Sequence, residues 1–342
     1  MGFAGYGSTQ LRYDMFELTR SADEAKRLHK CGNIYHRGQE LAWDGREVLA
    51  ELLAKHGGVH VGAVERGALE RVFAIILWGE LAAWKISAQL ADRLVPLEAK
   101  LAATSQAFDE ARHFYVMHDY LAALGYTPKR LDRAPQALLE LVLGTDELAE
   151  KLMGMQLMIE TIALALFQAV RERAIEPALT ELMRYYERDE ARHVGLGMQY
   201  APSLIQGMSP LQLARLGTFQ VRILFWAFAE MRLMAPDLRT LGIDPRAIIE
   251  SVRAKQLAAL GAAYGVVGIQ LDKRRNPLAM ALNAAVELSF PPEPAPLPSR
   301  ARAAWSAFWK PTRPGPLSTF DVHHHAIRTA RGVVLGDEGE PA

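Results

Sequence analysis

The hydrophobic pattern predicts helices along most of the chain. Between about residues 40 and 290, apolar positions recur every three or four residues, and good helix formers such as Ala, Leu, Met, Glu, Arg and Gln fill the segments. No window alternates like a strand for more than a few residues, so the predicted fold class is all-α. We expect long helices over about 66–94, 98–124, 146–173 and 178–200, and shorter ones over about 43–56, 210–235, 244–270 and 277–288.

Proline and glycine punctuate this pattern and suggest its larger divisions. Breakers include Pro96, Gly125, Pro177, Pro202 and Pro236. Beyond about residue 291 the stretches "PPEPAPLPS" and "KPTRPGPL" are proline-rich, which predicts an irregular tail with a short aromatic segment, "AAWSAFW", inside it. We therefore expect an N-terminal extension over 1–60, a helical bundle over 61–205, accessory helices packed on it over 206–290 and a proline-rich tail over 291–342.

One charged pentapeptide, DEARH, occurs twice within apolar, helix-like runs. In each copy the glutamate and the histidine are three residues apart, so they share one face of a helix. Another glutamate occurs 30 residues before the glutamate of each copy. Each of the three positions in the second set lies 80 residues after the matching position in the first set. This spacing predicts a duplicated helical hairpin. The positions are Glu80, Glu110 and His113 in the first set and Glu160, Glu190 and His193 in the second.

Helix geometry predicts that the six side chains meet at one level. At a rise of about 1.5 Å per residue, the chain climbs about 24 Å from Glu80 to Pro96 and descends about 21 Å to Glu110. The second hairpin does the same around Pro177. Each glutamate interrupts a largely apolar stripe that we expect to face inward. The predicted stripes are Phe73, Leu77, Glu80 and Trp84; Ala103, Gln106, Glu110, His113 and Met117; Met153, Leu157, Glu160, Leu164 and Phe167; and Met183, Tyr186, Glu190, His193 and Gly197.

Four buried glutamates require positive charge between them. Burying one unpaired carboxylate already costs several kcal/mol, and four would repel one another. The local basic residues are too few for an ion-pair network, whereas two divalent cations would balance the four charges with both histidines neutral. A carboxylate-rich site with only two imidazoles suits iron or manganese. The six residues are therefore the predicted metal ligands and catalytic residues.

The rest of the pentapeptide predicts support for these ligands. Asp109 and Asp189 lie about 100° round the helix from the glutamates. Each could accept a hydrogen bond from the metal-bound histidine of the opposite helix and fix its tautomer. Arg112 and Arg192 could then pair with the aspartates. Tyr186, one turn before Glu190, is either a hydrogen-bond donor or redox relay, or a packed core residue.

The six-position pattern resembles the ferritin-like carboxylate-bridged di-iron superfamily over about residues 60–200. The DEARH form is most similar to its oxygen-activating branch: monooxygenase hydroxylases, ribonucleotide reductase small subunits with their oxidase relatives, and soluble acyl-carrier-protein desaturases. The resemblance implies a ferritin-like four-helix bundle with additional C-terminal helices, holding two iron ions or a Mn/Fe pair. It further implies an O₂-dependent oxidase or monooxygenase of a small apolar or aromatic molecule, supplied with electrons by a ferredoxin or a flavin reductase.

Several alternatives stay open within the superfamily. One is a ferroxidase or iron store, another is a peroxide-detoxifying protein of the manganese-catalase or rubrerythrin kind, and a third is a structural bundle that retains a metal. Rubrerythrin-type proteins usually add a CxxC iron site, which a single cysteine, Cys31, excludes. The position that holds a radical tyrosine in ribonucleotide reductase subunits is Met117 here.

Small and apolar residues near the ligands have two interpretations. Glycines within helices either leave space for substrate or O₂, or allow close helix packing; they are Gly79, Gly154, Gly195 and Gly197. Large apolar residues in the same region either line a pocket or belong to the core; they are Phe114, Met155, Met158 and Phe167.

Charge and composition exclude some classes of partner. The 342 residues include 39 Lys and Arg against 39 Asp and Glu, so the formal net charge is zero and neither nucleic acid nor an anionic membrane is favoured. A single cysteine fits a reducing, cytoplasmic location. No uncharged apolar run of about 18 residues occurs, so we expect no membrane span. The helices after residue 210 could form a homodimer face or a lid on the pocket.

Overall fold

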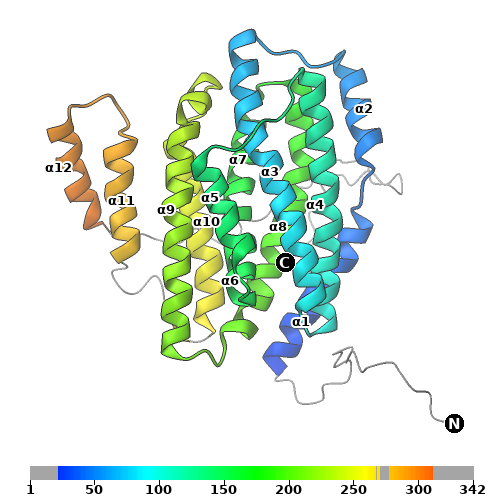
Figure 1. Cartoon of the computed structure of the whole chain (residues 1–342), viewed down its shortest axis with the longest axis vertical. Coiled ribbons are helices and arrows are strands. Elements are labelled where there is room, and N and C mark those ends of the chain that lie inside the picture. The colour runs from blue at the N-terminus through cyan, green and yellow to red at the C-terminus, as the bar shows by residue number, and fades with distance from the viewer. Residues whose placement is uncertain (1–21, 267, 270–276, 311–342) are drawn as a thin grey trace, which may run out of the picture.

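The computed structural model describes residues 22–266, 268–269 and 277–310, and within these ranges the regular structure is entirely helical (Figure 1). The all-α prediction is confirmed. The elements are α1 (Ala22–Glu40), α2 (Gly45–His56), α3 (Ala63–Arg93), α4 (Leu97–Leu124), α5 (Arg133–Gly144), α6 (Leu148–Leu152), the π-helix η1 (Met153–Ile159), α7 (Glu160–Arg173), α8 (Pro177–Ile205), α9 (Pro210–Thr240), α10 (Pro245–Gly265), α11 (Pro277–Ser289) and α12 (Leu297–Phe308).

Two antiparallel hairpins, α3–α4 and α7–α8, form the centre of the molecule (Figure 1). Local sequence explains their ends. α4 ends at Gly125, which adopts φ 90°, a conformation that glycine reaches without steric cost. α8 begins after Glu176, whose carboxylate accepts hydrogen bonds from the N–H groups of Ala178 and Leu179, with Pro177 in the first turn. Helices α1 and α2 cover α4 and α8 on one side, while α9 packs on α3 and α5, and α10 on α7 and α8.

The bundle interior has two apolar clusters with a polar layer between them. One cluster includes Phe73, Met117 and Phe167, and the other includes Ile86 and Leu157. The predicted metal residues lie between these groups along the same helices. Apolar packing on both sides keeps bulk water from the polar layer, which strengthens every electrostatic interaction inside it.

The helix predictions were wrong at several places. Helix α1 was missed because its sequence is mostly polar and only a narrow strip, which includes Leu28 and Cys31, is buried. Helix α5 was also missed. Pro202 and Pro236 lie inside α8 and α9 rather than ending them. Each of these prolines removes one hydrogen bond near the end of a long helix whose packing holds it in place.

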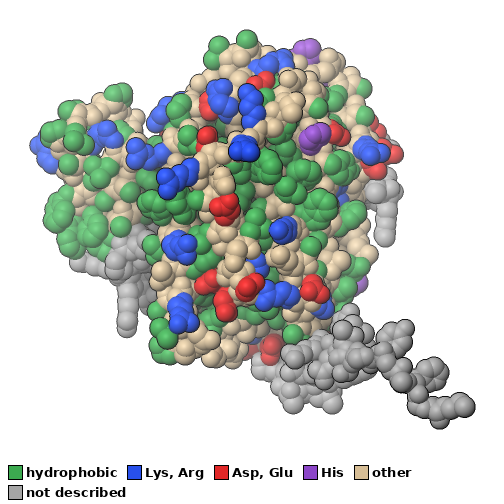
Figure 2. All heavy atoms as spheres, viewed as in Figure 1, with side chains coloured by type: hydrophobic (Ala, Val, Ile, Leu, Met, Phe, Trp, Pro, Cys, Tyr) green, Lys and Arg blue, Asp and Glu red, His purple; other side chains and the backbone are tan. Residues whose placement is uncertain are grey.

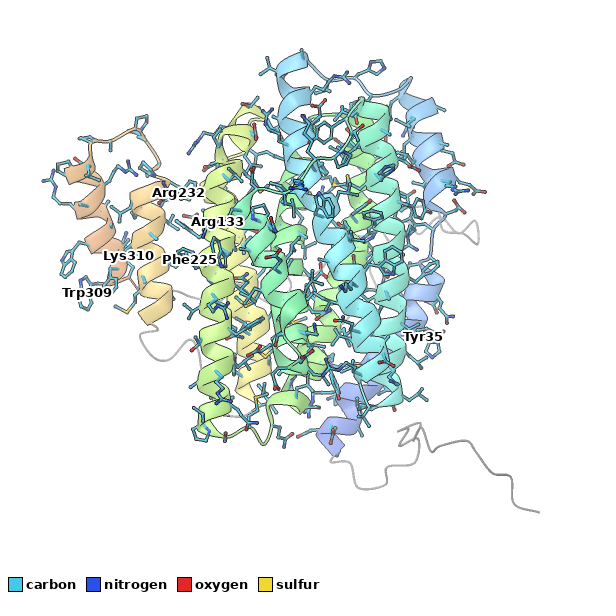
Figure 3. All side chains as sticks on the ribbon, in the orientation of Figure 1. Tyr35, Arg133, Phe225, Arg232, Trp309 and Lys310 are labelled. Carbon is cyan, nitrogen blue, oxygen red and sulfur yellow. The ribbon has the colours of Figure 1, made fainter. Side chains whose placement is uncertain are left out.

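The predicted irregular tail contains a helix. Leu297–Phe308, with most of the segment "AAWSAFW", forms α12, which packs against α11. Trp305 is 67% exposed and Trp309 is 47% exposed, and Figure 3 shows Trp309 pointing away from the bundle. The remaining predicted tail, 311–342, and the predicted N-terminal extension before residue 22 lie outside the described residues.

The third long helix, expected to be continuous over 146–173, is divided. A short α6 leads into the seven-residue π-helix η1, and α7 begins at Glu160. The stretch Leu148–Arg173 is long and apolar enough to span a bilayer, yet 72% of its most apolar window is buried inside the protein. Such burial is typical of a core helix. Acidic and basic side chains are interspersed over the face shown in Figure 2, as expected from the zero net charge.

Candidate metal centre

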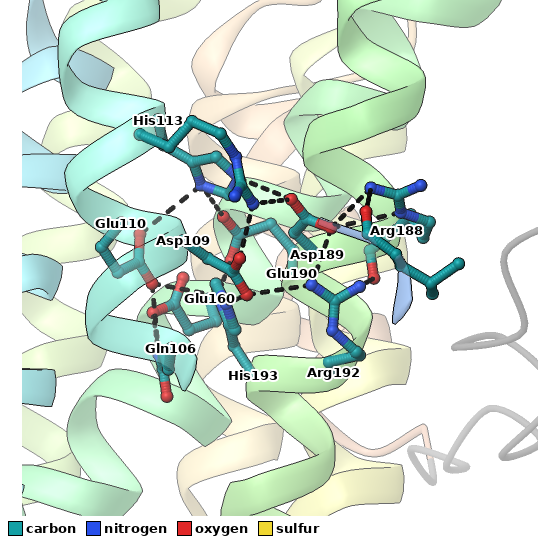
Figure 4. Close-up of polar contacts among 12 residues, drawn as sticks. Gln106, Asp109, Glu110, His113, Glu160, Arg188, Asp189, Glu190, Arg192 and His193 are labelled. Atoms are coloured by element: carbon teal, nitrogen blue, oxygen red, sulfur yellow. Dashed lines mark hydrogen bonds and ion pairs between the residues drawn. The ribbon is translucent and has the colours of Figure 1, made fainter. Parts of the chain in front are cut away.

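The structure brings the six predicted ligands together from four helices. Figure 4 shows five of them, Glu110, His113, Glu160, Glu190 and His193. Glu80 comes from α3, Glu110 and His113 from α4, Glu160 from the first position of α7, and Glu190 and His193 from α8. All six are at most 4% exposed. Their ligand atoms form two overlapping groups, each within 4.8 Å: Glu80, Glu110, His113 and Glu190 in one, and Glu110, Glu160, Glu190 and His193 in the other.

Two of the six residues belong to both groups, and the other four belong to one group each. Glu110 and Glu190 belong to both groups, so they have the arrangement of carboxylates that bridge two ions. Glu80 with His113 completes one group, and Glu160 with His193 completes the other. Each hairpin therefore contributes one glutamate shared by both groups, one end glutamate that belongs to a single group, and one histidine.

Both histidines present the same nitrogen to the carboxylates. His113 Nδ1 lies 3.2 Å from Glu190 Oε1 and 3.4 Å from Glu80 Oε2, and His193 Nδ1 lies 2.9 Å from Glu110 Oε1. The opposite nitrogen faces an aspartate of the other hairpin: His113 Nε2 is 3.3 Å from Asp189, and His193 Nε2 is 3.4 Å from Asp109. The predicted crossed hydrogen bonds are thus present. A proton held on Nε2 leaves the Nδ1 lone pair directed at the carboxylates.

The residues of this site fit a pair of metal ions. Buried polar atoms without a hydrogen-bond partner cluster there, namely His113 Nδ1, Glu110 Oε2 and Glu190 Oε1. Buried polar atoms are rarely left unsatisfied, and these three belong to the residue types that bind iron and manganese. Burial raises the pKa of Glu80 and of Glu160 well above the usual value of a glutamate. A divalent ion would remove that penalty by replacing the missing hydration of the charged form.

A second charged layer lies behind the histidines and is neutralised by arginine. Arg112 contacts Asp109 and Asp189, the latter at 2.8 Å, and Arg192 contacts the same two aspartates at 2.9 and 2.8 Å. Burial opposes ionisation of Asp189, but Arg192, Arg188 and Arg112 outweigh it and hold its pKa well below the usual range. The arginines thus pair with the aspartates, and among the described residues no arginine or lysine forms an ion pair with the four glutamates.

Sequence reasoning missed several residues that complete the site. Trp43 donates its indole N–H to Asp189 Oδ2 at 2.8 Å, and the Arg112 guanidinium lies 4.7 Å from the Trp43 ring centre. Gln106 donates to Glu110 and Glu160, both at 3.2 Å, and Gln156 of η1 donates to Gln106 at 3.3 Å. The buried position of Gln106 in its predicted stripe was the available signal. Trp43 precedes the duplicated region, so the repeat gave no signal for it.

The structure also shows the surroundings of residues whose roles were left open. Tyr186 donates to the His113 carbonyl at 2.6 Å and stacks on the His113 ring with centroids 4.2 Å apart, so it is a packed donor. Trp84 is 39% exposed, so its predicted place on the inward stripe was wrong. A Cβ at Gly197 would lie 2.6 Å from Leu157, which indicates close packing, whereas nothing lies within 4 Å of one at Gly79.

A pocket adjoins the metal centre on the side of α5 and α9. Glu80 and Glu160 contribute to its wall, and Gly79 lies beside them. Its volume is about 80 Å³. Phe114, Met155, Met158 and Phe167 do not line it; the last three are buried in the core clusters. The pocket therefore approaches the centre from the side of the end glutamates, between the bundle helices α3 and α7 and the helices α5 and α9.

One protein-family model matches the chain. It is described as p-aminobenzoate N-oxygenase AurF, and it covers residues 92–266, just over half of the sequence. No curated protein sequence matches the chain.

Solved structures share the fold at low sequence identity. An aldehyde-deformylating oxidase from Synechococcus is 23% identical, with a TM-score of 0.51, over 59% of this chain and 92% of that one. A variant of an R2-like ligand-binding oxidase with a Mn/Fe cofactor is 16% identical, with a TM-score of 0.52, over 67% and 92%. The ribonucleotide reductase R2 subunit from Clostridium botulinum is 13% identical, with a TM-score of 0.52, over 70% and 82%. These likenesses confirm the ferritin-like fold.

Proposed function

Because the chain belongs to the p-aminobenzoate N-oxygenase AurF family, we propose that it is a di-iron N-oxygenase of a small aromatic amine, with a Mn/Fe pair as the alternative cofactor. The observation that carries the proposal is the pair of overlapping ligand groups, in which Glu110 and Glu190 are shared. We assign Glu80 and His113 to one ion, and Glu160 and His193 to the other. Membership of this family makes the protein a dinuclear-metal oxidoreductase, and the aromatic amine is the proposed substrate class.

The reaction that we propose adds one oxygen atom to the amino nitrogen. A primary aromatic amine, O₂, two electrons and two protons give the N-hydroxylamine and water. Two metal ions held by the six ligands would transfer the electrons to O₂. An external reductase, either a ferredoxin or a flavin reductase, would supply the two electrons.

The protein's own residues prepare the site for this chemistry. Asp109 and Asp189 hold the histidine Nε2 protons, so that each Nδ1 stays available as a ligand. The ion pairs with Arg112 and Arg192 keep those aspartates charged. Gln106 donates to Glu110 and Glu160 and restrains both carboxylates. The apolar wall formed by Ile75, Ala83 and Leu138 limits water beside Glu80 and Glu160.

Reconstitution and product analysis test this function. The protein is loaded with Fe(II) under anaerobic conditions, reduced chemically, and exposed to isotopically labelled O₂ with an aromatic amine. We expect one labelled oxygen in the hydroxylamine product, detected by mass spectrometry. The matched control is Glu110→Ala, which removes a shared carboxylate and should abolish product. Uptake of many irons without amine oxidation would instead show a ferroxidase, and rapid peroxide breakdown by the Mn(II)-loaded protein would show a catalase.

A further inference from the structure

The pocket beside the metal centre has one polar side chain that no metal site accounts for. Its apolar walls come from five elements, with Ile75 and Ala83 from α3, Leu138 and Leu139 from α5, Ile159 from η1, Ile162 from α7 and Met231 from α9. Besides the end glutamates Glu80 and Glu160, the charged residue that lines it is Glu230, also on α9.

The Glu230 carboxylate has no partner within the described part of the protein. No hydrogen bond or ion pair engages it there, although the side chain is partly buried. Burial alone raises its pKa to about 7, without a contribution from any neighbouring charge. A partly desolvated carboxylate without a partner is costly, so a group that supplies a hydrogen-bond donor would gain free energy by binding there.

The described lining of this pocket includes no Lys, Arg or His. Lys85 and Arg130 lie instead in the neighbouring groove, which shares Leu139 with the pocket. A substrate carboxylate would therefore meet Glu230 without a compensating cation, and like charges brought together in an apolar site repel strongly. The family description names p-aminobenzoate, a molecule that joins an aromatic amine to a carboxylate. This pocket is poorly suited to such an anion.

We propose that Glu230 is a specificity-determining residue that selects aromatic amines with a second hydrogen-bond donor, such as an amide, amino or hydroxyl group, and rejects aromatic carboxylates. This inference rests on the proposed function, because it places the reacting amine toward Glu80 and Glu160 and the second donor toward Glu230. The pocket volume of about 80 Å³ is smaller than the roughly 150 Å³ of an engineered cavity that binds benzene. Met231 and Met234, which line it, are flexible side chains that can move aside for a ring.

Equilibrium binding to the metal-loaded protein without O₂ tests the inference separately from catalysis. Calorimetry at pH about 8, where Glu230 is ionised, compares three aromatic amines of nearly the same shape. They differ only in the group para to the amine. This group contains a hydrogen-bond donor in p-aminobenzamide, only an acceptor in p-aminoacetophenone, and a negative charge in p-aminobenzoate. We expect the amide to bind about tenfold or more tightly than the ketone, as for one hydrogen bond to a charged group. The carboxylate should bind most weakly.

Variants of Glu230 should change this order in defined ways. Glu230→Gln keeps the shape but removes the charge and adds an amide donor, so the ketone and the carboxylate should gain affinity relative to the amide. Glu230→Leu should remove the preference between amide and ketone. Glu140→Gln, on the exposed face of α5, is the matched control and should leave all three affinities unchanged. Thermal unfolding of each variant shows whether it remains folded.

The outcomes separate the inference from the function on which it rests. If p-aminobenzoate binds the unaltered protein as tightly as p-aminobenzamide, or if Glu230→Gln leaves their ratio unchanged, the inference is wrong even when amines are N-oxygenated. If the selectivity is found but no aromatic amine is oxidised in the presence of O₂ and reductant, the pocket assignment stands and the proposed reaction is wrong.

Discussion

The two hairpins contribute matching ligands through different backbones. Glu80 lies in the middle of α3, an uninterrupted helix of 31 residues, whereas Glu160 follows directly after the seven-residue π-helix η1. The Glu80 carboxylate lies 3.4 Å from His113, while Glu160 accepts from Gln106, which is in turn bonded to Gln156 of η1. π-Helical turns occur frequently at functional sites. The duplicated pattern therefore specifies which donors meet, while the surroundings of the two ions differ.

The largest expected effect concerns which ligand serves which ion. Glu110→Ala removes a carboxylate shared by both groups and should abolish binding of both ions. Glu80→Ala and Glu160→Ala each remove a ligand of one group, so each should leave one of the two ions bound. Metal analysis after reconstitution measures the stoichiometry. If Glu80→Ala and Glu160→Ala each lost both ions, the assignment of one end glutamate to each ion would be wrong.

The second prediction compares the two aspartates. Asp109→Asn and Asp189→Asn should each lower metal affinity by about 10–100-fold, because each weakens the hold on one histidine. Asp189 also contacts Arg188 and Trp43, which Asp109 does not. Removing the charge of Asp189 should therefore cost more stability, about 3–5 kcal/mol, as expected when a buried ion-pair partner is lost.

Urea unfolding of the metal-free proteins measures this difference. Metal-free protein is the right sample because metal loss alone changes stability by linkage. An Asp109→Asn variant that is as destabilised as Asp189→Asn would show that the two aspartates contribute equally to stability, despite their different contacts.

The sequence predicted the convergence of the donors better than the environment around them. Helix periodicity and an 80-residue repeat, both of which can be read from the sequence alone, predicted that the four glutamates would meet: Glu80, Glu110, Glu160 and Glu190. Domain boundaries at 60, 205 and 290 stay predictions. Asp109 and Asp189 followed from the angular offset of one residue on a helix, and their crossed contacts are present.

What the sequence could not provide depends on packing between segments that share no repeat. Trp43 reaches Asp189 from the loop between α1 and α2, 146 positions earlier. η1 has the composition of an ordinary apolar helix, so no residue type marks its wider turns. In the sequence, Glu230 is one charge within the apolar stretch "FQVRILFWAFAEMRLM", and only the packing of α9 on α3 and α5 places it in the pocket.

The third prediction compares glycines of the two hairpins. Gly197→Ala in α8 would place a Cβ 2.6 Å from Leu157 and 2.8 Å from Gln156 of η1, so we expect a loss of about 1–3 kcal/mol from overpacking. Gly79→Ala in α3 meets nothing within 4 Å and should stabilise the protein by up to about 1 kcal/mol through helix propensity. It should also narrow the pocket and weaken binding of aromatic amines. Equal destabilisation by both changes would show that Gly79 is packed as tightly as Gly197.

The smallest expected effect is a pH dependence of stability that arises outside both hairpins, at Glu230. Burial raises the pKa of this carboxyl from its usual 4.5 to about 7. Between these two pH values the folded protein keeps a proton that the unfolded chain has released, so stability falls as pH rises from about 4.5 to about 7.

The variant Glu230→Gln tests this pH dependence, because its side chain cannot ionise and should lack this component of stability. We expect the variant to gain about 1 kcal/mol relative to the unaltered protein between about pH 5 and pH 8, because each pKa unit corresponds to about 1.4 kcal/mol and residual water in the pocket screens part of the charge. Urea unfolding at the two pH values measures the difference, with Glu140→Gln as the control. A constant difference between the two proteins would show that Glu230 is well solvated, and it would weaken the case for a desolvated carboxylate in the pocket.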